Sequence, residues 1–335
     1  MHTLITGGAG FIGSHMIERL IAAGDRVTVI DDLSTGRVEN IQHVLKTGRC
    51  KLIVSSVMER ELVDRLVDES DRVFHLAAAV GVKLIVEQPV HTIQTNIHGS
   101  EVVLSAAAKY RKPIFVASTS EVYGKSAKIP FREDDDVVYG NTTLRRWSYA
   151  VSKAVDEFLA LAYYDKVGLP VVVARLFNTV GPRQTGMYGM VVPRFVEAAL
   201  NNKPLRVFGD GQQTRCFGDV ADVVGAIVKL IEEPHAHGQV FNIGNNTPIS
   251  IENLAKHVIE LTGSSSKIEY VPYEEAYAPG FDDMRVREPS LEKIKAMIGY
   301  KPTYTLDQTL NRIIESMKQE RQAKGQRKPA VAAMA

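Results

Sequence analysis

The feature that most restricts the fold is a glycine-rich turn, TGGAGFIG at residues 6–13, which directly follows an apolar strand pattern. Glycine permits the tight turn expected at Gly7, a close ligand approach at Gly10 and close helix packing at Gly13. An amphipathic helix pattern begins within the turn. A helix that begins here points free N–H groups and its positive dipole end at an anion. The pattern predicts a site for the pyrophosphate of a dinucleotide, with Phe11 and Ile12 beside it.

The second strand pattern ends in two carboxylates, Asp31 and Asp32. Asp31 follows Gly13 by 18 residues, close to the roughly 20 expected for a carboxylate that binds the adenosine ribose. Negative charge at this point repels a 2′-phosphate, so the sequence favours NAD over NADP. Arg37 is a nearby cation that favours the opposite choice. Asp32 is either a second cofactor ligand or a solvated or capping residue.

Short apolar strand patterns alternate with longer helix patterns over the first 175 residues. The strands are expected at 3–6, 26–30, 51–54, 72–76, 114–117 and 171–174, and the clearest helices at 11–23, 90–110 and 148–166. Nearly continuous apolar strands are typical of parallel sheets that are covered on both faces. The alternation therefore predicts an α/β fold with a doubly wound parallel sheet.

The pattern changes after residue 176, where Gly and Pro become frequent and shorter strands and helices follow. We expect a cofactor-binding domain over residues 1–176 and a smaller α/β substrate-binding domain over 177–318. A later strand near 239–244 is expected to return to the first domain. The tail at 319–335 is rich in Lys, Arg, Gln and Ala without an apolar stripe, which predicts disorder.

The overall composition excludes several classes of protein. A net charge of +1 gives no general attraction to nucleic acid or to an anionic membrane. We find no apolar run near 20 residues and no secretory signal pattern. The two cysteines have neither disulfide-framework nor metal-ligand spacing, so we expect reduced thiols, no bound metal and a cytoplasmic location.

A tyrosine and a lysine four residues apart, Tyr149 and Lys153, lie on one face of a predicted helix. The phenol has an ordinary pKa of about 10. A neighbouring ammonium and the positive nicotinamide ring of the cofactor both favour the phenolate, which lowers that pKa and makes Tyr149 an acid/base for an alcohol proton. The alternative is an ordinary surface pair, which such spacing often produces by chance. The glycine turn earlier in the chain favours the catalytic interpretation.

Polar residues follow the fifth predicted strand, at the strand end where doubly wound folds hold their ligands. Thr119 or Ser120 is expected to hydrogen-bond the reacting hydroxyl. Glu121 offers a carboxylate that can move a proton of the bound substrate or assist the loss of a carboxyl group. Its alternative interpretation is a cap for the turn after the strand.

Six segments, in this order, carry a family resemblance: TGGAGFIG, HLAAAVGVK, STSEVYG, YAVSK, RLFNTVGPR and GDGQQTRCF. They resemble the extended short-chain dehydrogenase/reductases that modify nucleotide sugars, over about residues 2 to 317. The resemblance implies a Rossmann fold, bound NAD and a homodimer in which the helices at 90–110 and 148–166 pair across a two-fold axis.

The resemblance also assigns roles to further residues. Leu76, Ala77 and Ala78 are expected to line the cofactor, Lys83 to lie near its phosphates and Asn96 to stand behind the nicotinamide. Asn178 and Arg215 match family positions that hold the substrate diphosphate, with Arg285 or Arg287 assisting. Guanidinium groups suit that task because they bind phosphate oxygens bidentately.

The family includes UDP-sugar 4-epimerases, UDP-glucuronate decarboxylases and nucleoside-diphosphate-sugar 4,6-dehydratases, which all begin by oxidising sugar carbon 4. On the keto sugar that the resemblance implies, Glu121 would move a proton at carbon 5 or assist the loss of the carboxyl group. We narrowly favour a UDP-sugar 4-epimerase of the UDP-glucose or UDP-glucuronate type. A UDP-glucuronate decarboxylase is second. It is kept because the run Thr119-Ser120-Glu121 resembles decarboxylases more closely than typical epimerases. A 4,6-dehydratase is third. A non-catalytic NAD-binding protein is disfavoured because Tyr149 and Lys153 are both present.

Overall fold

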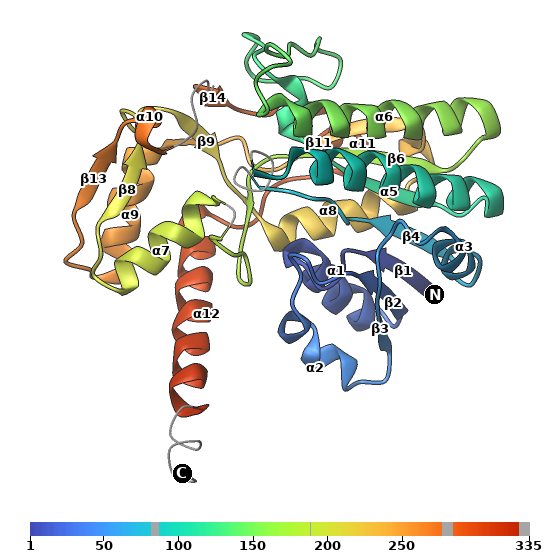
Figure 1. The fold of residues 1–335 in the computed structure, drawn as a ribbon, viewed down its shortest axis with the longest axis horizontal. Helices are drawn as coiled ribbons and strands as arrows, with labels where there is room; N and C mark the ends of the chain where they lie inside the picture. Colours follow the sequence, from blue (N-terminus) through green and yellow to red (C-terminus); the bar gives the residue numbers. More distant parts are fainter. Residues whose placement is uncertain (82–86, 188, 277–283, 328–335) are drawn as a thin grey trace.

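The computed structural model describes residues 1–81, 87–187, 189–276 and 284–327. Its centre is a seven-stranded parallel sheet in the order β11-β6-β5-β4-β1-β2-β3 (Figure 1). The strands are β1 (His2–Thr6), β2 (Arg26–Asp31), β3 (Cys50–Val54), β4 (Arg72–His75), β5 (Ile114–Thr119), β6 (Val171–Leu176) and β11 (Gln239–Ile243). The order reverses beside β1, so this is the doubly wound α/β sheet that the sequence predicted.

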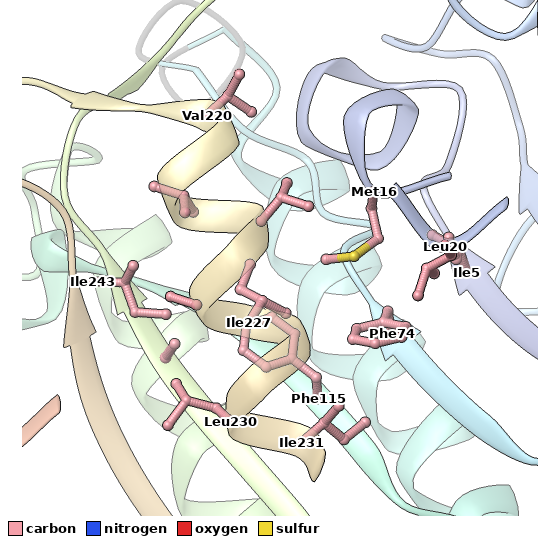
Figure 2. Close-up of a cluster of buried hydrophobic side chains, with 14 of the residues drawn as sticks. Ile5, Met16, Leu20, Phe74, Phe115, Val220, Ile227, Leu230, Ile231 and Ile243 are labelled. Carbon is pink, nitrogen blue, oxygen red and sulfur yellow. The ribbon is translucent and has the colours of Figure 1, made fainter. Parts of the chain in front are cut away.

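Helices cover both faces of the sheet because the apolar side chains of each strand point to both sides. One face carries α1 (Phe11–Ala22), α8 (Val220–Glu232) and α11 (Glu292–Ile298). The other carries α3 (Arg60–Asp68), α5 (Pro89–Tyr110) and α6 (Trp147–Val167). Figure 2 shows the first core, in which Ile227 of α8 and Met16 of α1 lie over Phe74 and Phe115 of the strands.

The chain after β6 builds a smaller body beside the sheet (Figure 1). Its elements are β7 (Thr179–Val180), α7 (Val191–Leu200), β8 (Leu205–Phe208), β9 (Thr214–Cys216), β10 (Gly218–Asp219), β12 (Pro248–Ser250), α9 (Ile251–Thr262), β13 (Ile268–Val271), α10 (Tyr273–Ala276), β14 (Val286–Arg287) and α12 (Leu306–Arg327). A separate core lies among α7, α9 and α12. The strand β11 lies apart from this body, because it pairs in parallel with β6 of the central sheet. Which body binds which ligand stays a prediction.

Short elements connect the larger ones: η1 (Val38–Asn40), α2 (Gln42–Leu45), η2 (Ser120–Tyr123) and η3 (Pro234–Ala236). Of these, η2 matters most for function, because it follows β5 directly and contains Ser120 and Glu121. No helix in the described ranges combines the length and apolar character needed to cross a bilayer.

The start of the tail differs from the prediction of disorder. Helix α12 continues to Arg327, and of the tail only residues 328–335 lie outside the described ranges. Arg321 donates hydrogen bonds to the carbonyl oxygens of Leu200, at 3.0 Å, and Glu197, at 3.4 Å. These carbonyls belong to the last turn of α7. The carbonyl oxygens of a last turn have no N–H partner within their own helix. The missing apolar stripe was misleading because Lys, Arg, Gln and Ala are strong helix formers.

Candidate active site

A cavity of about 790 Å³ opens where the strands of the sheet end at their carboxyl sides. Loops after β1, β2, β4, β5 and β6 line it from the sheet. Residues of the smaller body, including Phe208, Arg215 and Arg287, close it from the opposite side. A cavity between these two bodies is large enough for a drug-sized ligand and is where an open α/β sheet binds its ligands.

The glycine turn forms one wall of this cavity and opens α1. Gly7 adopts a positive φ of 71°, which a side chain disfavours. A Cβ on Gly13 would lie 2.4 Å from the carbonyl oxygen of Gly7, so only glycine lets the helix begin this close to the strand. Gly10 caps α1 without a side-chain hydrogen bond. The first turn therefore offers its N–H groups to an anion, which fits the pyrophosphate of NAD.

Asp31 and Asp32 both line the cavity, but their surroundings differ. Asp31 is buried, and its two oxygens accept hydrogen bonds from the N–H groups of Ala9 and Leu33, both at 2.9 Å. Burial raises its pKa, and these two hydrogen bonds oppose that rise. Each carboxylate oxygen keeps a lone pair for a ribose hydroxyl. Asp32 is exposed and accepts hydrogen bonds from Ser34, so it also orders the turn after β2.

The loop after β4 supplies another wall through Leu76, Ala77 and Ala78, where the sequence predicted cofactor contacts. Asn96 of α5 is buried behind this loop. Its side-chain oxygen accepts a hydrogen bond from the N–H of Ala79 at 2.8 Å, and its amide donates to Ser152 at 3.1 Å. Asn96 thus joins the loop to α6. The predicted phosphate contact Lys83 lies outside the described residues.

Tyr149 and Lys153 lie on α6 and both line the cavity. The hydroxyl of Thr119 lies beside the Tyr149 phenol and favours its ionised form. Burial, followed by the negative charge of Glu121, nevertheless raises the pKa of Tyr149 above its ordinary value. Among the groups of the chain itself, these two effects outweigh those that favour the phenolate, so the lowering expected from Lys153 and the nicotinamide ring together stays a prediction. The Lys153 ammonium donates a 2.6 Å hydrogen bond to Asp156, a partner that was not foreseen from the sequence.

Glu121 lies between two arginines at the substrate side of the cavity. Arg146, at the start of α6, pairs with one of its oxygens, and Arg287 of β14 pairs with the other at 2.9 Å. Burial alone would raise the pKa of Glu121, but the two guanidinium groups outweigh it and hold the pKa at about 2. Glu121 is therefore an anion at neutral pH. In this state it can accept a proton but cannot donate one.

Two buried donors next to this cluster have no hydrogen-bond partner among the described residues. They are the hydroxyl of Ser120 and the Nε of Arg287, and both residues line the cavity. Buried polar groups in proteins are nearly always hydrogen-bonded. The two groups are thus available to a polar ligand.

Three of the four predicted substrate-binding residues line the cavity. Asn178 and Arg215 line the cavity. Asn178 donates a hydrogen bond to the carbonyl of Cys216 at 3.3 Å, and Arg215 donates to that of Thr214 at 2.7 Å. Arg287 also lines the cavity, whereas Arg285 is exposed, forms a 2.7 Å ion pair with Asp210 and is not among the lining residues described.

Two residues of the site were not predicted. Arg146 precedes Tyr149 by three residues, and Asp156 follows Lys153 by three residues. Positions three apart are neighbours on a helix, so this spacing on α6 was the signal available. It was insufficient because surface charges at the same spacing are common.

Comparison with known proteins places the chain among enzymes that act on nucleotide sugars. Residues 4–313 match the family described as GDP-mannose 4,6 dehydratase. A UDP-N-acetyl-alpha-D-glucosaminuronate decarboxylase of Bacillus cytotoxicus is 44% identical over 313 residues, covering 93% of this chain and 96% of the relative. UDP-glucuronic acid decarboxylase 4 of Arabidopsis thaliana is 36% identical over 321 residues, covering 95% of this chain and 69% of the relative.

Solved structures of this fold include complexes with a UDP-sugar and NAD. UDP-glucuronic acid 4-epimerase from Bacillus cereus, in complex with UDP-glucuronic acid and NAD, superposes with a TM-score of 0.85 at 28% identity. The match covers 95% of this chain and 99% of that chain. The chain therefore belongs to the GDP-mannose 4,6-dehydratase family of the extended short-chain dehydrogenase/reductases, an NAD-using family that includes UDP-sugar decarboxylases, epimerases and dehydratases.

Proposed function

We propose that this protein is an NAD-dependent decarboxylase of a UDP-hexuronate, the reaction that the sequence ranked second. The observation that carries the proposal is the cluster of Arg146, Glu121 and Arg287 beside Tyr149. Two guanidinium groups face one carboxylate, which leaves one positive charge in excess. That excess, with the unpartnered Nε of Arg287, suits a sugar that itself carries a carboxylate.

The two curated relatives described above support the same choice, since both are named as decarboxylases of UDP-linked uronates. The first is 44% identical along nearly the whole chain. A UDP-hexuronate with or without a 2-acetamido group is therefore the substrate class that we propose.

The cluster also fits the chemistry of decarboxylation. When bound, NAD accepts a hydride from carbon 4 of the sugar and later returns it. Oxidation at carbon 4 turns the uronate into a β-keto acid, in which the carbon 4 carbonyl takes up the electron pair released as carbon dioxide leaves. Carbon 5 then gains a proton from the solvent, so the net change is UDP-hexuronate and one proton to UDP-pentose and carbon dioxide.

The residues of the chain divide this work. Tyr149 removes the proton of the 4-hydroxyl and returns it at the end, with Thr119 and Ser120 as hydrogen-bonding neighbours. Arg287 and Arg146 bind the sugar carboxylate, and the anionic Glu121 fixes both guanidinium groups. Asn178 and Arg215 bind the diphosphate. The glycine turn and Asp31 hold the pyrophosphate and ribose of NAD.

A product assay separates decarboxylation from the alternatives. The chain is incubated with NAD and either UDP-glucuronate or UDP-N-acetylglucosaminuronate, while released carbon dioxide is measured and products are identified by NMR. We expect one carbon dioxide for each UDP-pentose formed. A uronate epimer without carbon dioxide contradicts the proposal and establishes the 4-epimerase that the sequence favoured. Conversion of UDP-glucose or GDP-mannose to a 4-keto-6-deoxy sugar indicates a dehydratase, and no turnover of any sugar indicates a non-catalytic protein.

We further propose that the protein acts as a cytoplasmic homodimer. Outward-facing apolar side chains on the packed pair α5 and α6 support the dimer: Val90, Ile93, Val151, Val155 and Phe158. Phe158 is 72% exposed, which is unusual for a large aromatic side chain without a partner.

A further inference from the structure

The buried pair of Lys153 and Asp156 has no task in the reaction as described above. The Lys153 ammonium donates a 2.6 Å hydrogen bond to one oxygen of Asp156, and both side chains are almost fully buried, at 2% and 0% exposure. A buried ion pair is weak evidence for stability, because desolvation of the two charges offsets most of their attraction. The pair therefore calls for another explanation than stability.

A row of further buried polar residues extends from Asp156 toward the glycine turn. Burial raises the pKa of Asp156, and the charge of Lys153, followed by the hydrogen bonds of Lys153 and of Ser100 on α5, opposes that rise. The hydroxyl of Ser100 also contacts Nε2 of His75 at 3.0 Å, and Nδ1 of His75 contacts the hydroxyl of Thr6 at 2.8 Å. Burial, followed by the charge of Lys153, lowers the pKa of His75 to about 3, so its ring is neutral. The ion pair with Lys153 makes Asp156 the anion of this group.

Tyr149 lies between charges from several elements. Glu121 of η2 and Asp156 of α6 disfavour the phenolate, whereas Arg146, the residue before α6, favours it. His75 of β4 is neutral, and Arg287 of β14 is paired with Glu121. Lys153 lies one helical turn after Tyr149, the position from which its charge can reach the phenol, but its ammonium is paired with Asp156.

We propose that Asp156 is a positioning residue: it holds the Lys153 ammonium through their 2.6 Å hydrogen bond and offsets its charge, and so sets the pH at which Tyr149 can begin the reaction. Asp156 acts on the first proton transfer. The proposal rests on the proposed function only in that Tyr149 acts on a sugar hydroxyl. Removing the charge of Asp156 leaves the full charge of Lys153 to act on Tyr149. The phenolate then forms more easily, and the reaction begins at lower pH.

The test uses two variants, Asp156→Asn, which keeps the shape, and Asp156→Ala, which is smaller and retains a good helix former. Asp165→Asn, an exposed position on the same helix, is the matched control. The NAD-loaded chain is titrated by the ultraviolet absorbance of tyrosinate, and Tyr149→Phe identifies the contribution of Tyr149. We expect the midpoint of Tyr149 to fall by on the order of one pH unit in both variants and to stay in place in Asp165→Asn.

Single-turnover reduction of NAD by the uronate substrate gives the second readout. The acid limb of its pH profile should move to lower pH by the same amount in the Asp156 variants. Unchanged midpoints and unchanged limbs in whichever variant folds overturn the proposal. The titration needs no substrate, so a failure of the proposed function shows separately, as an absence of NAD reduction in the parent chain.

Discussion

Glu121 owes its ionisation to residues that lie far from it in the chain. Arg146 is 25 residues away and Arg287 is 166 residues away, and each pairs with one of its oxygens. Burial alone would favour the neutral acid, yet the two cations hold its pKa at about 2. Proton donation to carbon 5, one of the roles open from sequence, is therefore unsuited to Glu121 at neutral pH. The carboxylate is suited to ordering the two guanidinium groups.

At the same scale, two neighbouring arginines provide a matched pair of variants. Arg287→Gln should lower kcat/KM for the uronate by about 10²-fold or more, because it leaves Arg146 as the single buried cation for two carboxylates, those of Glu121 and the substrate. Arg285→Gln should remain close to the parent chain, since that side chain is exposed and pairs with Asp210. Steady-state kinetics of both variants check this. Equal losses would contradict the assignment of Arg287 to the carboxylate.

At the scale of elements, the start of α1 depends on one glycine. Gly13→Ala would place a Cβ 2.4 Å from the Gly7 carbonyl oxygen and 2.6 Å from Gly8 Cα, so the helix must move away from the strand. We expect unfolding to become easier by on the order of 1–3 kcal/mol and NAD affinity to fall. Denaturant unfolding and NAD titration measure the two effects.

Gly225→Ala, within α8, is the control for Gly13→Ala. A Cβ there meets only the tip of Arg19, at 3.7 Å, which is an ordinary contact. Alanine should stabilise the helix by about 0.5–1 kcal/mol and leave NAD affinity unchanged. If Gly13→Ala behaved like Gly225→Ala, close packing of α1 on the glycine turn would not be needed for cofactor binding.

At the scale of the whole molecule, the exposed apolar face of α5 and α6 leads to a prediction about assembly. Val151, Val155 and Phe158 follow one another at intervals of four and three residues, so they share one side of α6. Phe158→Glu should give a monomer, because burying a charge in an isologous contact repeats the cost in both subunits. Sedimentation measures the mass. Tyr270→Glu, an exposed aromatic position on β13, should leave the dimer intact, and a monomeric parent chain would rule the dimer out.

The sequence alone determined the features that depend on local geometry. Alternating strand and helix patterns predicted the doubly wound sheet, since apolar periodicity reflects which faces of an element are covered. The glycine spacing predicted the turn before α1, because the positive φ at Gly7 and the contact at Gly13 admit little else. Over residues 319–327 the helix propensity of the residues favoured a helix, whereas the missing apolar stripe favoured disorder. The prediction of disorder was wrong there.

Only the tertiary structure decided the charge states of the site. Tyr149 and Lys153 were recognisable from their spacing, but the pairing of Lys153 with Asp156 was not. The choice of Arg287 over Arg285 likewise depended on how β14 lies against the cavity. The physical reason is that the pKa of a buried group depends on desolvation and on every charge within a few ångströms. Folding brings those charges together from distant parts of the chain, and no local pattern records them.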